Sequence, residues 1–300
     1  MKSPVPECVW PVGAELGEGP VWLASEGALW FVDIKGRRIH RFDEASGGRR
    51  SWPAPEPIGF LAPVEGGGFL CGLKSGLYRF DPDTGAFEAH LTGFEPTELD
   101  NRLNDGFVDA DGRLWFGSMH DGETEASGAL YRLEDGPSVR RWDEGYHVTN
   151  GPATSPDGRL LYHVDTLKRT IWTFDVDDEG GLSGKRVFTH IERPGAYPDG
   201  LAVDVEGGVW VALFAGWGVE RFDPAGRLAA RIEMPCANVT KPAFGGPKLK
   251  TLYLTTAWMG LSEQARVDQA LAGGLFRLEM DLAGLAQNCV RLIEVATTRR

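Results

Sequence analysis

Three oxygen-bearing side chains, Glu18, Asn150 and Asp199, each stand directly before a glycine in the stretches GEGPVW, VTNGPATS and YPDGLAVD. A turn that leads into a strand needs glycine or proline, but it needs no carboxylate. If the two carboxylates and the amide oxygen met at one point, they would repel one another or stay unsatisfied without a cation among them. Calcium, magnesium and manganese prefer such oxygen ligands, so these residue types suggest a site for a hard divalent cation.

A sixfold repeat in the sequence provides a way for residues this far apart to meet. Segments that combine aliphatic residues with an aromatic one recur at 27–34, 67–73, 112–119, 158–165, 207–214 and 250–257. Their spacing is typical of four-stranded propeller blades. Most are followed by a second strand-like segment that runs into a Gly- or Pro-containing turn, such as DPDTG or DPAG, which indicates a hairpin. The sequence therefore predicts an all-β protein, a six-bladed β-propeller that occupies residues 1–300 as one domain.

The two ends of the chain carry short apolar segments, PECVW at 6–10 and VRLIEVA at 290–296. We expect them to pair in one blade and so to close the ring, because closure removes the exposed strand edges that a sheet-rich protein must otherwise protect.

The innermost strands of a propeller surround a central channel, so equivalent positions of the six repeats face one another at its mouth. The residues that precede Gly or Pro in these positions are Glu18, Ile58, Asp105, Asn150, Asp199 and the pair Thr240-Lys241. An isolated Asn-Gly or Asp-Gly is usually only a turn. Repeated placement around one axis favours a shared site instead, in which Lys241 either pairs with a carboxylate or contacts a substrate.

Composition excludes several other classes of protein. The net charge of -12 disfavours binding to nucleic acid, which needs a basic face. The sequence contains no apolar run of membrane-spanning length and no signal peptide, and its four cysteines are widely spaced. These features predict a cytoplasmic protein with free thiols, and we expect a monomer that binds neither nucleic acid nor membrane. A serine nucleophile is disfavoured because no Gly-x-Ser-x-Gly motif occurs.

The sequence resembles the SMP-30/gluconolactonase/regucalcin-like family in the stretches LGEGPVW, NRLNDGFVDADGRLWFGSM, TNGPATSPDGRLLYHVDT and YPDGLAVDVEGGVWVALFAGWGVERFDPAG. The stretches VTNGPATSPDG and NVTKPAFGGPKLKTLYLTTA look most like bacterial sugar lactonases of the xylonolactonase type. This resemblance implies a six-bladed propeller with one divalent metal at the channel mouth, held by Glu18, Asn150 and Asp199. Calcium, manganese, zinc and iron(II) are the candidate metals.

The resemblance also implies roles for residues around that metal. Arg102 and Asn104 match substrate-binding positions, and Asp199 matches the catalytic base. A substrate-contacting carboxylate is expected in the loop after Met119, HDGETEASG. We assign Glu123, and the alternatives are Asp121 or neither residue of this loop. From its neighbours alone, Arg102 has a second interpretation as the partner of Asp100 or Asp109 in a salt bridge.

The expected activity is metal-dependent hydrolysis of a small sugar lactone, xylonolactone or a related pentono- or hexonolactone, to the aldonic acid. Two alternatives remain open. Related propellers reuse one metal site for different substrates, so the protein could hydrolyse another ester or a phosphotriester. A propeller that binds calcium or a protein partner without catalysis is the second alternative, because a fold alone does not define a function.

Overall fold

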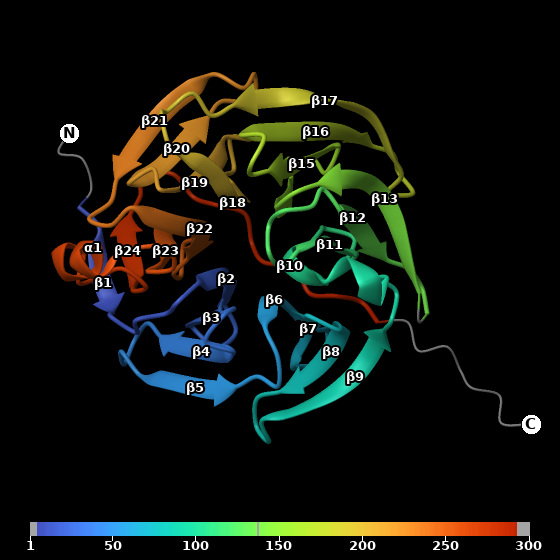
Figure 1. Ribbon diagram of the computed structural model, residues 1–300, viewed down its shortest axis with the longest axis horizontal. Coiled ribbons are helices and arrows are strands. Elements are labelled where there is room, and N and C mark those ends of the chain that lie inside the picture. The colour runs from blue at the N-terminus through green and yellow to red at the C-terminus, as the bar shows by residue number, and fades with distance from the viewer. Residues whose placement is uncertain (1–4, 137, 293–300) are drawn as a thin grey trace, which may run out of the picture.

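Six antiparallel sheets of four strands are arranged like blades around a central axis in the computed structural model (Figure 1). The structure describes residues 5–136 and 138–292. Besides strands, these residues contain one α-helix, α1 (Glu263–Asp268), and one 3-10 turn, η1 (Thr97–Leu99). The predicted six-bladed β-propeller is confirmed.

Each blade begins with its innermost strand and ends at the periphery. Blades 1 and 2 consist of β2 (Gly17–Leu23), β3 (Ala28–Asp33), β4 (Arg38–Asp43) and β5 (Arg49–Pro53), and of β6 (Ile58–Pro63), β7 (Phe69–Leu73), β8 (Gly76–Asp81) and β9 (Ala86–Thr92). Blades 3 and 4 consist of β10 (Asn101–Val108), β11 (Leu114–His120), β12 (Gly128–Leu133) and β13 (Val139–Tyr146), and of β14 (Thr149–Thr154), β15 (Leu160–Asp165), β16 (Thr170–Val176) and β17 (Leu182–His190). Blades 5 and 6 consist of β18 (Tyr197–Val203), β19 (Val209–Phe214), β20 (Gly218–Phe222) and β21 (Leu228–Glu233), and of β22 (Asn238–Gly245), β23 (Thr251–Ala257), β24 (Leu275–Glu279) and β1 (Glu7–Trp10).

The hydrophobic core lies between neighbouring blades. Between blades 1 and 2, Trp30 stacks on Trp52 with ring centroids 5.1 Å apart, and Phe69 packs against Trp30 at 4.8 Å. All six residues of β3 are buried, whereas the peripheral strand β21 is mostly exposed. Aliphatic and aromatic residues therefore gather in the inner strands because both faces of those strands pack against adjacent blades.

The ring closes where the N-terminal strand joins the last blade. β1 pairs antiparallel with β24, with Cys8 opposite Phe276. The predicted closure of the ring by an N-terminal and a C-terminal segment is confirmed, but the C-terminal partner of 6–10 is β24 and not the segment that begins at residue 290. Val290 instead forms a parallel bridge with Val64 in blade 2, and residues 293–296 lie outside the described part of the chain. After β24 the chain crosses the end of the channel, where the backbone N–H of Val290 donates to the Pro63 carbonyl at 2.7 Å, so Val290 pairs with blade 2 and not with β1.

All four cysteines are free thiols. None of the described helices is long and apolar enough to span a membrane.

Candidate functional site

Every innermost strand has an irregular register beside the position that the repeats share. The irregularities lie between Glu18 and Val21, Ile58 and Phe60, Leu103 and Gly106, Asn150 and Ala153, Pro198 and Leu201, and Val239 and Lys241. A bulge inserts a residue into one strand and so turns a side chain away from the regular alternation. Gly19 and Gly151 have positive φ angles of 55° and 73°, which glycine adopts without strain. The Gly-containing motifs therefore bend the strands where the polar side chains must face the axis.

Glu18, Asn150 and Asp199 meet at one small pocket of about 170 Å³. They come from β2, β14 and β18, and their exposed fractions are only 4%, 2% and 7%. The Asn150 amide donates to Thr166 Oγ1 at 2.9 Å, and its oxygen accepts from Asn104 Nδ2 at 3.2 Å. These contacts fix the orientation of the amide, so its oxygen is held toward the same pocket as the two carboxylates.

The carboxyl groups of Glu18 and Asp199 lie within hydrogen-bonding reach of each other. Burial, followed by the negative charge of Asp105, raises the pKa of Glu18 to about 7. Burial and the charges of Glu18 and Asp105 also raise the pKa of Asp199 well above its ordinary value. Because both groups resist ionisation in this environment, the pair requires either a proton or a cation between the two carboxylates.

This donor set fits a divalent cation. Within the described residues, no lysine or arginine forms a salt bridge with Glu18 or Asp199. A group of three or more histidine, cysteine, aspartate or glutamate side chains arranged around a metal is likewise absent from the described chain. The third oxygen here comes from the amide of Asn150. Two close carboxylates and an amide oxygen suit a hard cation that takes oxygen ligands.

Arg102 and Asn104 line the same pocket from β10. Arg102 is only 2% exposed, and its Nε donates to Asp121 Oδ1 at 3.0 Å, while Nη1 donates to Asn104 Oδ1. The alternative salt bridges to Asp100 or Asp109 are absent, because those aspartates pair with Lys74 and Arg113. Asp121 thus holds a buried guanidinium at the pocket wall.

The loop after Met119 contributes two carboxylates with different surroundings. Glu123 lines the pocket, whereas Asp121 lies behind Arg102. Burial raises the pKa of Asp121, but hydrogen bonding to Lys35 and the charge of Arg102 outweigh it and lower the pKa to about 2. Asp121 is therefore occupied by protein cations, and Glu123 is the carboxylate that faces the pocket.

Sequence reasoning missed the apolar wall of this pocket. Tyr197, Phe214 and Met259 line it, together with Leu16, Ile34, Val148 and Leu167. The residues come from several blades. Leu16, Val148 and Tyr197 each stand two positions before one of the three candidate ligands, so the repeated motif could have indicated this part of the wall.

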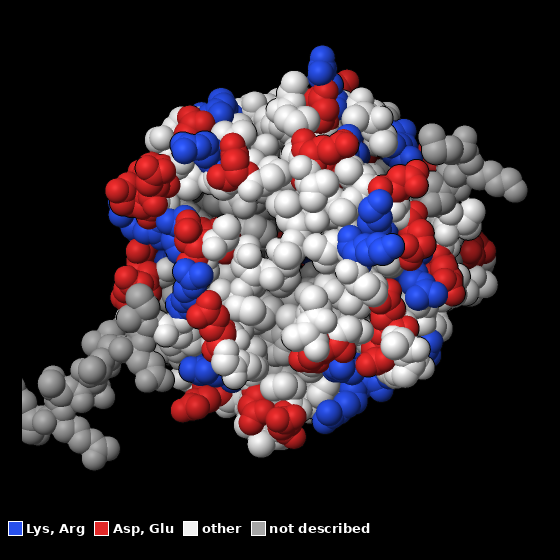
Figure 2. Space-filling view, turned by 180° about the vertical axis from the view of Figure 1, so that it is seen from behind, with Lys and Arg blue, Asp and Glu red and all other residues white. Residues whose placement is uncertain are grey.

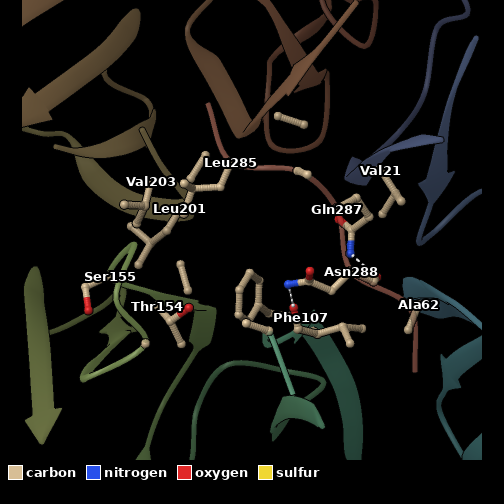
Figure 3. A pocket seen from close by; sticks show the side chains of 18 of the residues that line it. Val21, Ala62, Phe107, Thr154, Ser155, Leu201, Val203, Leu285, Gln287 and Asn288 are labelled. Carbon is tan, nitrogen blue, oxygen red and sulfur yellow. Dashed lines mark hydrogen bonds between the residues drawn. The ribbon is translucent and has the colours of Figure 1, made fainter. Parts of the chain in front are cut away.

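A second and larger cavity, about 550 Å³, occupies the other end of the channel. Leu201, Phe107 and Ala62 line it, and Leu285 and Gln287 of the C-terminal segment run along one side (Figure 3). The face opposite the view of Figure 1 carries its charged side chains mainly around the periphery, with a mostly uncharged centre (Figure 2). None of the predicted metal ligands, substrate-binding residues or the predicted base lines this cavity; of the residues that the repeats place at the axis, Lys241 does. We therefore assign the chemistry to the smaller pocket despite its size.

Comparisons with known proteins agree with this architecture. A 6-deoxy-6-sulfogluconolactonase from Pseudomonas putida is 33% identical over 94% of this chain and 97% of its own length. A regucalcin from Danio rerio is 34% identical over 93% of this chain and 95% of its own. The crystal structure of a calcium-binding protein, regucalcin, from Agrobacterium tumefaciens superposes with a TM-score of 0.90 at 28% identity, covering 97% of this chain and 98% of that one. The family model described as SMP-30/Gluconolactonase/LRE-like region matches residues 16–258, and the chain belongs to this family.

Proposed function

We propose that this protein hydrolyses a sugar lactone to the corresponding aldonic acid with the help of one divalent metal. The observation that carries the proposal is the buried pair of close carboxylates, Glu18 and Asp199, in a pocket that Arg102 and Asn104 also line. A scaffold has no need for two mutually repelling acids at its channel mouth. The lactonase named among the relatives supports the same reaction class.

Glu18, Asn150 and Asp199 would hold the metal, with calcium, manganese, zinc and iron(II) as candidates. When bound, a divalent metal supplies Lewis-acid chemistry, which polarises a carbonyl oxygen and stabilises the negative charge that develops on it. The oxygen-only donor set favours the harder members of this group.

Asp199 is the proposed general base. Its side chain is buried and lines the pocket, which supports a role at the reacting atoms. In the reaction, a water oxygen bonds to the lactone carbonyl carbon while Asp199 takes the proton of that water. The bond between the carbonyl carbon and the ring oxygen then breaks, and Asp199 returns the proton to the leaving alkoxide. Positioned proton transfer of this kind contributes about 10²–10⁴-fold to a rate.

Arg102, Asn104 and Glu123 are proposed to bind the hydroxyl groups of the sugar. Arg102 is already oriented by Asp121, so little of its conformational freedom remains to be lost when substrate binds. Tyr197, Phe214 and Met259 supply an apolar wall for the C–H face of the ring. The pocket volume is below the roughly 300–1,000 Å³ of sites for drug-sized ligands, which favours a single ring such as xylonolactone or a related pentono- or hexonolactone.

A lactonase assay on chelator-treated protein tests this proposal. Xylono-, arabino-, galactono- and gluconolactone are offered with calcium, manganese, zinc or iron(II) restored singly, and spontaneous hydrolysis is subtracted. We expect turnover with at least one pairing and a loss of about 10²-fold or more in Asp199→Asn. Asp223→Asn, in the exposed hairpin that follows β20, is the matched control and should keep full activity. Absence of turnover with every pairing would contradict the proposal.

Metal binding without catalysis is the second candidate, favoured by the description of the Agrobacterium tumefaciens relative as a calcium-binding protein. Tight calcium binding combined with no hydrolysis of any ester in the assay would support it.

A further inference from the structure

A buried ion pair joins two blades close to the candidate metal site. Lys241 Nζ bonds to Asp105 Oδ1, and the two residues are 7% and 1% exposed. Lys241 lies on β22 of blade 6 and Asp105 on β10 of blade 3, on opposite sides of the channel (Figure 1). Lys241 also lines the far cavity, whereas Glu18 and Asp199 line the near pocket. The pair therefore lies between the two halves of the channel.

The fold makes room for this lysine next to a candidate ligand. A Cβ atom on Gly200, the residue after Asp199, would lie 2.4 Å from Cγ of Lys241 and 2.6 Å from its Cβ. Glycine at this position thus lets the lysine stem pass blade 5 on its way to the axis. Burying an ammonium is costly unless it is paired, which indicates that the channel retains Lys241 for its charge.

Asp105 is fully engaged by protein donors. Besides Lys241, its carboxylate accepts from the backbone N–H groups of Gly106 at 2.7 Å and Gly151 at 3.0 Å. It contributes negative charge to the site while its oxygens are already used, so it is not available as a further metal ligand. The positive charge of Lys241 also acts on Glu18, and this places the ammonium within the electrostatic field of the metal site.

The formal charges of the side chains at the axis match the charge of one divalent ion. The carboxylates of Glu18, Asp105 and Asp199 and the ammonium of Lys241 leave a formal charge of -2. Farther out, the cations and carboxylates around Arg102 balance in number: Lys35, Lys74 and Arg102 against Asp100, Asp121 and Glu123. One divalent ion would therefore neutralise the axis.

We propose that Lys241 is a built-in cation that matches the charge of the channel to a single divalent metal and thereby sets the affinity and valence preference of the site. The inference rests on the metal-binding part of the proposed function. Without the lysine charge, the axis would carry a formal charge of -3, which favours tighter binding and a trivalent ion. The charge count of the ligand set is known to tune calcium affinity over a wide range.

Four variants of the full chain separate charge from structure. Lys241→Met removes the positive charge, Asp105→Asn removes the opposing negative charge, and the double variant removes both and restores the formal charge of -2. Arg221→Met is the matched control, because it breaks the salt bridge of another buried aspartate, Asp204, in blade 5. Calcium affinity is measured by titration calorimetry and terbium affinity by luminescence sensitised through nearby aromatic residues.

We expect Lys241→Met to bind calcium about tenfold more tightly or better, and Asp105→Asn to bind it more weakly by a similar factor. Because Coulomb energy scales with ionic charge, the logarithmic change for terbium should be about 1.5 times that for calcium. The metal affinities of the double variant should return to within about threefold of wild type. The affinities of Arg221→Met should equal those of wild type. Tighter binding in Lys241→Met cannot arise from partial unfolding, because partial unfolding would weaken the binding of every ion.

Equal affinities in all variants, or weaker binding in Lys241→Met, would overturn the inference and leave the lactonase proposal intact if wild type still binds metal and hydrolyses lactone. A wild-type protein that binds neither ion would overturn both.

Discussion

His163 lies on β15 with its side chain completely buried, and neither ring nitrogen has a hydrogen-bond partner among the described residues. Its ring packs edge-on against Tyr146, with centroids 4.7 Å apart. Burial lowers the pKa of His163 from 6.5 to about 3, and the charges of Asp143 and Lys185 act on it in opposite directions. The fold therefore accepts only the neutral imidazole.

The sign of the resulting pH dependence follows from where the proton binds. Below about pH 6.5 the unfolded chain takes up a proton on His163, whereas the folded protein does not until about pH 3. For each unit by which the pH falls within this window, the free energy of unfolding decreases by about 1.4 kcal/mol through this residue. Between neutrality and about pH 4.5 the loss amounts to about 3 kcal/mol.

His163→Leu removes this titration and the two unpartnered nitrogens while keeping an apolar side chain of similar size. Urea unfolding of wild type and variant at about pH 7, 5.5 and 4.5 gives the free energy of unfolding for each. We expect the free energy of unfolding of the variant, relative to that of wild type, to be higher at about pH 4.5 than at about pH 7 by about 3 kcal/mol. His40, whose pKa burial lowers to about 4, is present in both proteins and cancels from the difference. Parallel stability curves for the two proteins would refute the assignment of His163.

Two further predictions concern the site. In chelator, the metal-free protein should lose stability as the pH rises from about 4.5 to about 7, because burial and the charge of Asp105 raise the pKa of Glu18 to about 7 in the fold, whereas the unfolded chain already releases this proton near 4.5. Thermal unfolding with and without calcium measures this, and added metal should raise the unfolding midpoint most at and above about pH 7. A thermal unfolding midpoint that changes with neither pH nor calcium would contradict the carboxylate pairing of Glu18 and Asp199. Gly200→Ala should lower the free energy of unfolding by about 1–3 kcal/mol, because the added methyl group would overpack against the side chain of Lys241. Urea unfolding measures this change. An unchanged free energy of unfolding would show that the lysine side chain can move aside.

The sequence predicted the blade repeat and the convergence of Glu18, Asn150 and Asp199, because both depend on local pattern. Alternating apolar residues define strands, and the Gly-containing motifs recur where each inner strand bends, so equivalent positions had to face one axis. The sequence left open which carboxylate of the loop after Met119 faces the pocket; in the structure Glu123 lines it, whereas Asp121 pairs with Arg102.

Tertiary structure alone decided which groups neutralise one another. The pairing of Lys241 with Asp105 joins blades 6 and 3, and the cations around Asp121 come from blades 1, 2 and 3, so no local pattern specifies them. The course of residues 280–292 across the channel end was likewise not predictable, since an apolar stretch near the terminus fits either an edge strand or a crossing segment. Local sequence determines where a side chain points along its own strand, whereas the charge it meets there depends on packing between strands that are distant in sequence.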